Sequence, residues 1–201
     1  ATYANYALGA NLSGTAPGYV GILNVTGTTT GATQAWRNSN ALTVASGVRF
    51  GVNNTQNTRW TVDTYSAGRV LTTPSILVGS AVTQNIEFNG AGGVRASSSG
   101  GELILQNFGS GNLIFNTTIN ANGTSSLTKS GSGTVSIASA SGYTGVTRIN
   151  EGTLQLGNGG ALGSVGSASI INSGNLSFNR TDVFAAGYAI SGNGSVTQSG
   201  S

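Results

Sequence analysis

Large apolar residues recur along this chain in pairs, with one residue between the two members of each pair. Residues i and i+2 of a β-strand lie on one face, so each pair puts two large side chains inward and leaves the middle residue outside. From about residue 84 onward, strand and turn signals alternate at intervals of about 8 to 12 residues, which is typical of an all-β fold. The pairs are Ile86 and Phe88, Leu103 and Leu105, Leu113 and Phe115, Val135 and Ile137, Leu154 and Leu156, and Leu176 and Phe178.

Clusters of Gly, Ser and Asn separate these pairs, for example at 97–101 and 157–160. Gly accounts for 33 of the 201 residues, and each Gly inside a helix costs about 1 kcal/mol relative to Ala, so long helices are disfavoured. A β-sandwich would need longer strands and a thicker core. Short strands with Asn at recurring corners favour a parallel β-solenoid, in which coils stack and corner Asn amides form ladders along the stack.

The N-terminal part of the chain, residues 1–80, follows the same pattern less regularly. Candidate strands occur at 20–25, 42–44, 48–52, 59–62 and 75–78, and no Pro-rich or charged linker marks a domain boundary. We therefore predict one elongated, continuous domain. Residues 1–80 would form less regular coils, and residues 81–201 would form regular ones.

An internal repeat supports the solenoid. The segment LTKSGS at 127–132 returns as VTQSGS at 196–201, so that Val196 takes the place of Leu127 in the second copy. Three coils of about 23 residues would give this offset, within the range of stacked repeats. The second copy is cut off by the end of the sequence, which favours one segment of a longer fibre.

The stretch 127–157 has three parts in a fixed order: LTKSGSGT at its start, YTG at 143–145 and GTLQLG at its end. In this it resembles the autotransporter-associated β-strand repeat of bacterial passenger domains, with a partial second copy at 196–201. The resemblance implies a right-handed parallel β-helix that is secreted across a Gram-negative outer membrane and displayed or released outside. It implies no catalytic residues.

The residues of this stretch also have roles that do not depend on the resemblance. We expect Gly131 and Gly133 to bracket a tight turn before the inward pair that follows. Tyr143 is expected to pack its ring over a corner. Gly145 and Gly152 would allow the backbones of successive coils to approach closely.

Composition excludes several kinds of site. The chain has no Cys, His or Met and only 6% charged residues, so disulfides, Cys or His metal sites and Ser-His-Asp triads are excluded. The net charge of +3 comes from eight scattered cations, of which Lys129 is the only Lys, and nucleic-acid binders instead concentrate cations on one face. No run approaches the ~18 to 20 apolar residues of a membrane span, and no signal peptide is visible at the start.

Any acid–base catalysis would depend on five carboxylates. A glycosidase needs two of them about 5 to 10 Å apart, and Glu87 and Glu102 are the two that neighbouring coils could bring together. The simpler interpretation is a solvated face, with Glu87 at the outward middle position of its strand. The chain has no Asp-x-Asp motif, so a calcium site built from carboxylates is not expected. The five are Asp63, Glu87, Glu102, Glu151 and Asp182.

Arg49, Arg59 and Arg69 are evenly spaced along the chain, and Trp60 adjoins one of them. Arg forks beside an aromatic ring could bind glycans or phosphates. The simpler interpretation is a set of scattered surface cations. A coil of about 20 residues would place Arg49 and Arg69 above one another, where like charges repel.

The sequence thus predicts a structural or adhesive segment of an extracellular or cell-surface β-solenoid, outer membrane-associated or secreted. Its expected partners are copies of itself or further coils of the same polypeptide, stacked end to end, and surface glycans. We expect no enzyme activity, no catalytic, cofactor-binding or metal-binding residue, and no nucleic-acid partner. The alternatives are a polysaccharide lyase or hydrolase on a β-helix, and a glycan-binding module around Arg59 and Trp60.

Overall fold

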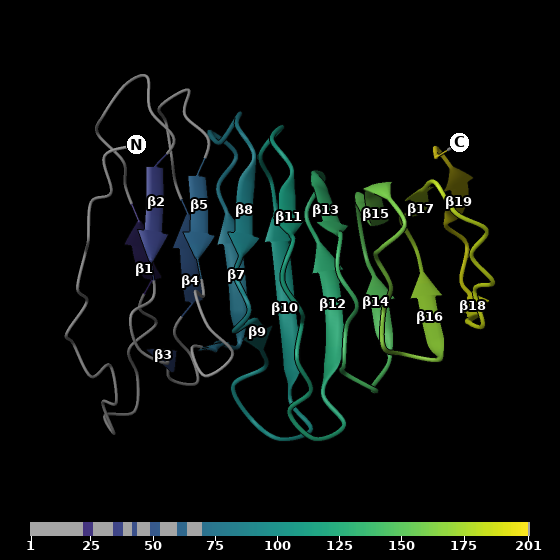
Figure 1. Ribbon diagram of the computed structural model, residues 1–201, viewed down its shortest axis with the longest axis horizontal. Coiled ribbons are helices and arrows are strands. Elements are labelled where there is room, and N and C mark those ends of the chain that lie inside the picture. Colours follow the sequence, from purple (N-terminus) through teal and green to yellow (C-terminus); the bar gives the residue numbers. More distant parts are fainter. Residues whose placement is uncertain are drawn as a thin grey trace.

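The chain winds into a parallel β-solenoid, whose coils stack along the long axis of the molecule (Figure 1). The structure is a computed structural model that describes residues 70–200 and, before residue 70, only the backbone of five strands. Every described strand pair is parallel. The described residues form no helix, and hence none long and apolar enough to cross a membrane. The predicted all-β solenoid is confirmed.

The strands form three sheets, and each coil contributes one strand to each sheet that it crosses. Sheet A contains, in order, β1 (Ile22–Val25), β4 (Arg49–Val52), β7 (Ser75–Val78), β10 (Glu102–Asn107), β12 (Ser126–Ser130), β14 (Thr147–Ile149), β16 (Ser169–Asn172) and β18 (Ala189–Ser191). Sheet B contains β2 (Gln34–Arg37), β5 (Trp60–Asp63), β8 (Ile86–Asn89), β11 (Leu113–Phe115), β13 (Thr134–Ile137), β15 (Thr153–Gly160), β17 (Asn175–Arg180) and β19 (Ser195–Gln198). Sheet C contains β3 (Leu42–Thr43), β6 (Leu71–Thr72) and β9 (Val94–Arg95). From residue 70 onward the chain makes about six turns.

The coils become shorter along the chain. On sheet B, Asn116 bonds to Asn89 across a sequence separation of 27, whereas Gln155 bonds to its strand partner Ser136 across a separation of only 19. The change coincides with the end of sheet C at β9, beyond which a single bridge to Ile119 continues it. The predicted coil of about 20 to 23 residues therefore describes the later coils. The earlier coils are longer because they carry a third strand.

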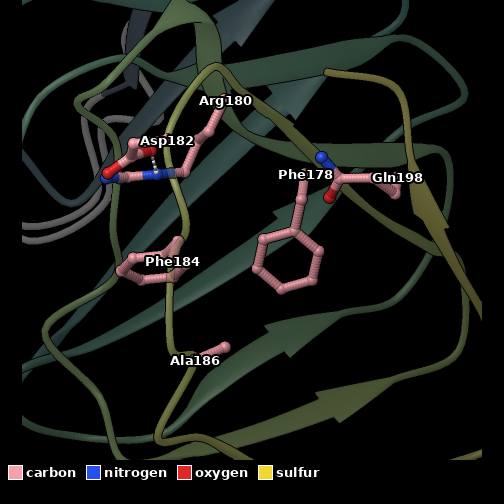
Figure 2. A pocket seen from close by; sticks show the side chains of 6 residues that line it. All are labelled: Phe178, Arg180, Asp182, Phe184, Ala186 and Gln198. Carbon is pink, nitrogen blue, oxygen red and sulfur yellow. Dashed lines mark hydrogen bonds and ion pairs between the residues drawn. The ribbon is translucent and has the colours of Figure 1, made fainter. Parts of the chain in front are cut away.

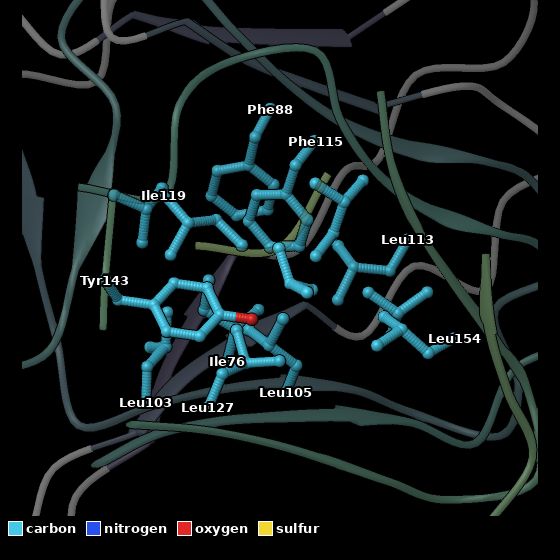
Figure 3. Close-up of a cluster of buried hydrophobic side chains, with 14 of the residues drawn as sticks. Ile76, Phe88, Leu103, Leu105, Leu113, Phe115, Ile119, Leu127, Tyr143 and Leu154 are labelled. Carbon is cyan, nitrogen blue, oxygen red and sulfur yellow. The ribbon is translucent and has the colours of Figure 1, made fainter. Parts of the chain in front are cut away.

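The inward pairs predicted from the sequence build a narrow, continuous core (Figure 3). Phe88 and Phe115 lie one above the other, with ring centroids 4.9 Å apart and planes 18° from parallel. Tyr143 lies across the core from Leu113, and its hydroxyl is 2.8 Å from the Thr147 hydroxyl. The ring is fully buried inside the core, so its predicted place over a corner is wrong.

Glycines bring the backbones of successive coils into contact, at Gly131 and Gly152 in the turn from sheet A to sheet B and at Gly145 in the connection from sheet B to sheet A. Gly131 has φ +81°, and a Cβ atom there would lie 2.5 Å from the carbonyl oxygen of Asn107 in the preceding coil. A Cβ atom at Gly152 would lie 2.4 Å from the carbonyl oxygen of Gly131, and one at Gly145 would lie 2.6 Å from that of Thr124. The close approach predicted at Gly145 and Gly152 is confirmed.

Buried Asn amides in the turn from sheet A to sheet B form hydrogen bonds with the next coil. Asn107 Nδ2 donates to the Thr134 carbonyl, and Asn172 Nδ2 donates to the Ser195 carbonyl, both at 2.8 Å. Each Asn also accepts a hydrogen bond at Oδ1 from the backbone N–H two residues later. Each Asn side chain thus pairs a backbone N–H group in the turn of its own coil. It also fixes the register of this coil against the next coil.

A second kind of Asn contact runs along the outside of sheet B. Asn116 Nδ2 donates to Asn89 Oδ1 of the preceding coil at 2.8 Å. Further along the stack, Ser195 Oγ donates to Asn175 Oδ1 at 2.9 Å. One rung of the predicted Asn ladder is therefore present, between Asn89 and Asn116, whereas a Ser takes the place of the second Asn at Asn175.

The two copies of the internal repeat lie on different sheets. Leu127 is in β12 of sheet A, whereas Val196 is in β19 of sheet B. Coil by coil, the residues that stack on Leu127 are Thr147, Ile170 and Ile190. Three coils therefore lead from Leu127 to Ile190, and the prediction that they lead to Val196 is wrong. Most of the predicted irregular part, residues 1–80, lies outside the described residues, so the division at residue 80 stays a prediction.

Candidate functional site

The carboxylates proposed as a catalytic pair are not brought together. Glu87 lies in the middle of β8 in sheet B, whereas Glu102 begins β10 in sheet A. Glu102 is exposed, and the Thr128 hydroxyl donates a hydrogen bond to its carboxylate. Among the described residues, no three acidic side chains gather as a metal site would require. The geometry therefore gives no support to a hydrolase centre at these two residues.

The expected solvation of Glu87 is wrong. It occupies the outward position of its strand, but only 6% of its surface is exposed. Ile114, which follows it in the same outward row one coil later, is also buried. The outer face of sheet B is thus covered in these two coils, and alternation along the strand cannot reveal such a cover.

The proposed Arg strip falls largely outside the described residues. Only the backbone of Arg49 and Trp60 is described, as part of β4 and β5. Next to Arg49, Phe50 pairs with Ile76 rather than with Val70, so the short coil that would stack Arg49 on Arg69 is wrong. Arg59 and Arg69 themselves are not described, and glycan binding at this strip stays a prediction.

A charged and aromatic cluster, here called the Arg180 cluster, lies where β17 ends (Figure 2). The buried Arg180 forms a bidentate ion pair with Asp182: Nε lies 2.9 Å from Oδ1 and Nη2 lies 2.8 Å from Oδ2. The carbon at the centre of the guanidinium lies 4.1 Å from the centroid of the Phe184 ring. The bidentate ion pair and the stacking on the Phe184 ring together hold the Arg180 side chain in one orientation. The cluster consists of Phe178, Arg180, Asp182, Phe184 and Tyr188.

Arg180 also ties two successive coils together. Its Nη1 donates to the Gly163 carbonyl at 2.6 Å, and its Nη2 donates to the Ala161 carbonyl. Both carbonyls belong to the connection between β15 and β16, one coil earlier. The hydrogen bond with Asp182 raises the pKa of Arg180 and lowers the pKa of Asp182. In the earlier coils the strands of sheet C lie in the connection from sheet B to sheet A. In this coil, which has no such strand, hydrogen bonds from the guanidinium link the connection to the preceding coil.

Replacing this guanidinium should loosen the last coils. Arg180→Lys keeps the charge but cannot reproduce the fork or bond both carbonyls, because an ammonium lacks the planar donor set. We expect a loss of about 1 to 3 kcal/mol in the free energy of unfolding, the usual cost of leaving buried polar groups unpaired. Urea unfolding followed by far-UV circular dichroism measures it. Asp182→Asn is the matched control, because Asp182 is exposed and the carbonyl contacts of Arg180 remain; we expect a smaller loss.

A small pocket adjoins the cluster, with a volume of about 130 Å³. Small-molecule sites usually have about 300 to 1,000 Å³, so the pocket is too small for a polysaccharide cleft. The rings of Phe178 and Phe184 face it (Figure 2). The guanidinium is already engaged in four hydrogen bonds to protein acceptors. The pocket is lined by Phe178, Arg180, Asp182, Phe184, Ala186 and Gln198.

The last coil exposes the apolar side chains that earlier coils bury. Ile190 of β18 stacks on the buried Ile170, yet 42% of its surface is exposed. Val196 of β19 stacks on the buried Leu176, and 52% of its surface is exposed. An apolar surface and two edge strands therefore lie together at this end of the described solenoid.

Lys129 is a buried cation inside the turn from sheet A to sheet B. Its Nζ donates to the carbonyls of Ser130 at 3.1 Å, Gly131 at 2.6 Å and Glu151 at 2.8 Å. Burial lowers the pKa of Lys129 to about 8, while the nearby charge of Glu151 acts in the opposite direction. The ammonium closes the turn, as the buried amides do in other coils, and its three protons are all engaged.

The low pKa of Lys129 should make the protein more stable as the pH rises above 8. Between about 8 and the ordinary value of 10.5, the unfolded chain binds more protons than the folded one, so the free energy of unfolding increases with pH. The slope is at most about 1.4 kcal/mol per pH unit. Burial raises the pKa of Tyr143, so stability should fall again above about pH 10, where the tyrosines of the unfolded chain ionise.

Thermal unfolding at several pH values tests this expectation. We expect the wild-type melting temperature to reach its maximum near pH 10, above the pH 5 to 8 that is usual for proteins. The variant Lys129→Met should show no rise between pH 8 and 10. A wild-type curve that is flat or falls across this interval would contradict the assignment.

Sequence reasoning missed the Arg180 cluster and the role of Lys129. The sequence did contain a signal for the burial of Lys129, because Lys129 is two residues after Leu127 and therefore lies on the same inward face. No comparable signal exists for the cluster, because Arg180 meets Ala161 and Gly163 through two connections without periodicity.

Comparisons with known proteins found one family model and one curated relative. Residues 127–156, which run from β12 into β15, match the family model of the Passenger-associated-transport-repeat. Over 72 residues the chain is 42% identical to the Adhesin BmaC autotransporter of Brucella suis biovar 1 (strain 1330). The match covers 36% of this chain but 2% of that relative, so the chain spans only a small part of it. No solved structure matches the chain.

Proposed function

The chain carries an autotransporter passenger repeat, and from this premise we propose that it is a segment of a bacterial cell-surface passenger with a mechanical and adhesive role. The observation that carries this proposal is the stacking of the matched repeat. Residues 127–156 make two consecutive coils of one continuous solenoid. Their strands pair residue by residue with the coils before and after them.

A role without catalysis agrees with the sites that the described residues offer. Glu87 and Glu102 lie on different sheets, the pocket is small, and Lys129 and Arg180 are engaged in holding coils together. The name of the relative, an adhesin, favours surface contact over turnover. Parallel coils joined by main-chain ladders give a stiff scaffold for such contact.

We place this segment outside the outer membrane. Antibodies raised against the purified chain should label intact cells of the bacterium that encodes it, with no gain on permeabilisation. Beads coated with the chain should bind host cells more than beads coated with an unrelated protein. Labelling that requires permeabilisation would contradict the location, and release of reducing ends from polysaccharides by the purified chain would contradict the absence of catalysis.

The partner that we propose for this segment is a further coil. The edges of β18 and β19 offer unpaired main-chain groups together with the exposed Ile190 and Val196, and such edges pair readily with another strand. A second copy of the chain that stacks end to end would continue the sheets, and a head-to-tail contact that does not close produces a fibre. Sedimentation velocity at rising concentration tests this, with a concentration-dependent increase in size as the expected result.

A further inference from the structure

We infer that Asn158 is a site of covalent modification, at which the side-chain amide is lost and aspartate or isoaspartate takes its place. The inference is independent of the proposed end-to-end stacking. It rests on the bulge in β15 that contains Asn158 and Gly159, and on a comparison with the other three Asn-Gly dipeptides of the chain. These dipeptides begin at Asn89, Asn122 and Asn193.

The reaction needs only an Asn, the backbone nitrogen of the next residue and water, and Asn is among the thermolabile residues. The nitrogen of Gly159 attacks Cγ of Asn158. A bond forms between these two atoms, the bond from Cγ to Nδ2 breaks, and the amide leaves as ammonia, which takes the proton of the Gly159 nitrogen. Water then opens the cyclic imide at one of its two carbonyls, giving aspartate or isoaspartate. Glycine favours ring closure, because it has no side chain in the way and adopts many backbone conformations.

The main chain around the modified residue is not tied into the regular ladder of sheet B. Leu156 pairs with Phe178, and Gly160 pairs with Arg180, so residues 157–159 face a single residue of β17. The extra residues of a bulge are left without ladder partners. This segment can therefore rotate into the conformation for ring closure without breaking the strand pairs on either side of it.

Asn158 and Gly159 are open to solvent on the side of the solenoid. Both residues are exposed, and a Cβ atom at Gly159 would meet nothing within 4 Å. None of the described residues forms a hydrogen bond with the Asn158 side chain. Two further strands of sheet B, β17 and β19, follow β15 (Figure 1), so this exposure does not come from a place in the last coil. Water and small reagents therefore reach the bulge.

Hydrogen bonds hold the side chains of two other Asn-Gly dipeptides. Asn89 Oδ1 accepts a hydrogen bond from Asn116 Nδ2 at 2.8 Å, and Asn122 Nδ2 donates to the Ala96 carbonyl at 2.9 Å. Each contact joins the dipeptide to a neighbouring coil. Ring closure would have to break it, so folding should slow the reaction at these two places.

At the fourth dipeptide the attacking nitrogen is itself engaged. Gly194 N–H donates to the Asn172 carbonyl at 2.9 Å, and a Cβ atom at Gly194 would lie 2.4 Å from the Gly174 carbonyl oxygen. The nitrogen is thus held against the preceding coil and is not free to approach Cγ of Asn193. Because Asn193 is exposed like Asn158, this dipeptide separates the effect of backbone pairing from the effect of exposure.

Hydroxylamine tests the assignment, because it cleaves the chain at the cyclic imide of an Asn-Gly dipeptide. The folded chain is incubated with hydroxylamine in mildly alkaline buffer, and the fragments are identified by mass spectrometry. The melting temperature in the same buffer checks folding, and a parallel incubation in urea removes the fold. Gly159→Ala adds a methyl group that hinders the attack. Gly160→Ala is the matched control, because a Cβ atom there also meets nothing within 4 Å.

We expect the folded wild type to be cut between Asn158 and Gly159 at least tenfold faster than at any other Asn-Gly dipeptide, and the four to react within threefold of one another in urea. Gly159→Ala should slow the cut at least tenfold, and Gly160→Ala should leave it within twofold. Storage of the folded chain without hydroxylamine should produce aspartate and isoaspartate at position 158 first.

Three results would overturn the assignment. The first is a folded chain that is cut equally at all four dipeptides, or first at the exposed Asn193. The second is a preference for Asn158 that persists unchanged in urea, because the local sequence and not the bulge would then cause it. The third is an intact amide at Asn158 in stored protein that has lost the amide at another of the four positions.

Discussion

Gly131→Ala should destabilise the protein by about 2 to 5 kcal/mol, the sum of a conformational and a steric cost. Gly131 has φ +81°, and a side chain in this region costs roughly 1 to 2 kcal/mol. Its Cβ atom would also lie 2.5 Å from the carbonyl oxygen of Asn107, which is fixed in the preceding coil, so the two backbones would have to separate. Overpacking of this kind typically costs a further 1 to 3 kcal/mol, roughly.

The chain offers a matched control for this substitution. Gly159 has nearly the same φ, +79°, but a Cβ atom there would meet nothing within 4 Å. Gly159→Ala should therefore lose only the conformational part, about 1 to 2 kcal/mol. Urea unfolding of both variants separates the two contributions. Equal losses would show that the backbones of successive coils do not touch at Gly131.

Phe115→Ala should destabilise the protein by about 3 to 5 kcal/mol, as large-to-small changes in a packed core do. Phe115 is fully buried, and its ring stacks on Phe88 at 4.9 Å (Figure 3). Main-chain ladders hold neighbouring coils at a fixed spacing, so these coils cannot collapse into the cavity.

Phe108→Ala is the control for this substitution, because it removes the same atoms from a side chain that is 42% exposed. We expect a loss below about 1 kcal/mol, as for most surface substitutions. Thermal and urea unfolding measure both variants. A loss at Phe115 no larger than that at Phe108 would mean that the inward rows do not form the core.

The strands could be predicted from the sequence because their signal is local. The spacing of Leu113 and Phe115, or of Val135 and Ile137, already fixes which side chains point inward, and β11 and β13 form at these places. Every candidate strand within 1–80 overlaps an observed strand. β2 (Gln34–Arg37) was missed because it has no pair of large aliphatic residues.

Coil length could not be predicted because the connections set it. The strand pattern does not say whether a connection contains a third strand, such as β9, or forms a simple loop, such as the one that contains Tyr143. The offset between the copies at 127–132 and 196–201 was therefore misread as three coils. Sequence similarity between two strands does not place them on the same sheet.

The candidate site was the least predictable part. Glu87 occupies the predicted outward position, yet it is buried, and alternation along a strand does not show whether its outward face is covered. The Arg180 cluster depends on the carbonyls of Ala161 and Gly163 in another coil. The local pattern of this chain thus reveals the strands, whereas the side-chain contacts between connections, such as those of Arg180, do not follow from it.

Engineered cysteine pairs test the stacking of the coils most directly, because the chain has no cysteine of its own. Thr153 of β15 and Asn175 of β17 are paired across neighbouring coils. Adjacent strands are about 4.8 Å apart, within the Cα range of about 4.4 to 6.8 Å that a disulfide spans. Thr153→Cys with Asn175→Cys should form an intramolecular disulfide on mild oxidation, detected by mass spectrometry. Thr153→Cys with Ser177→Cys, one diagonal step away, should remain largely reduced. Faster oxidation of the diagonal pair, or none in the paired positions, would contradict the register and with it the solenoid.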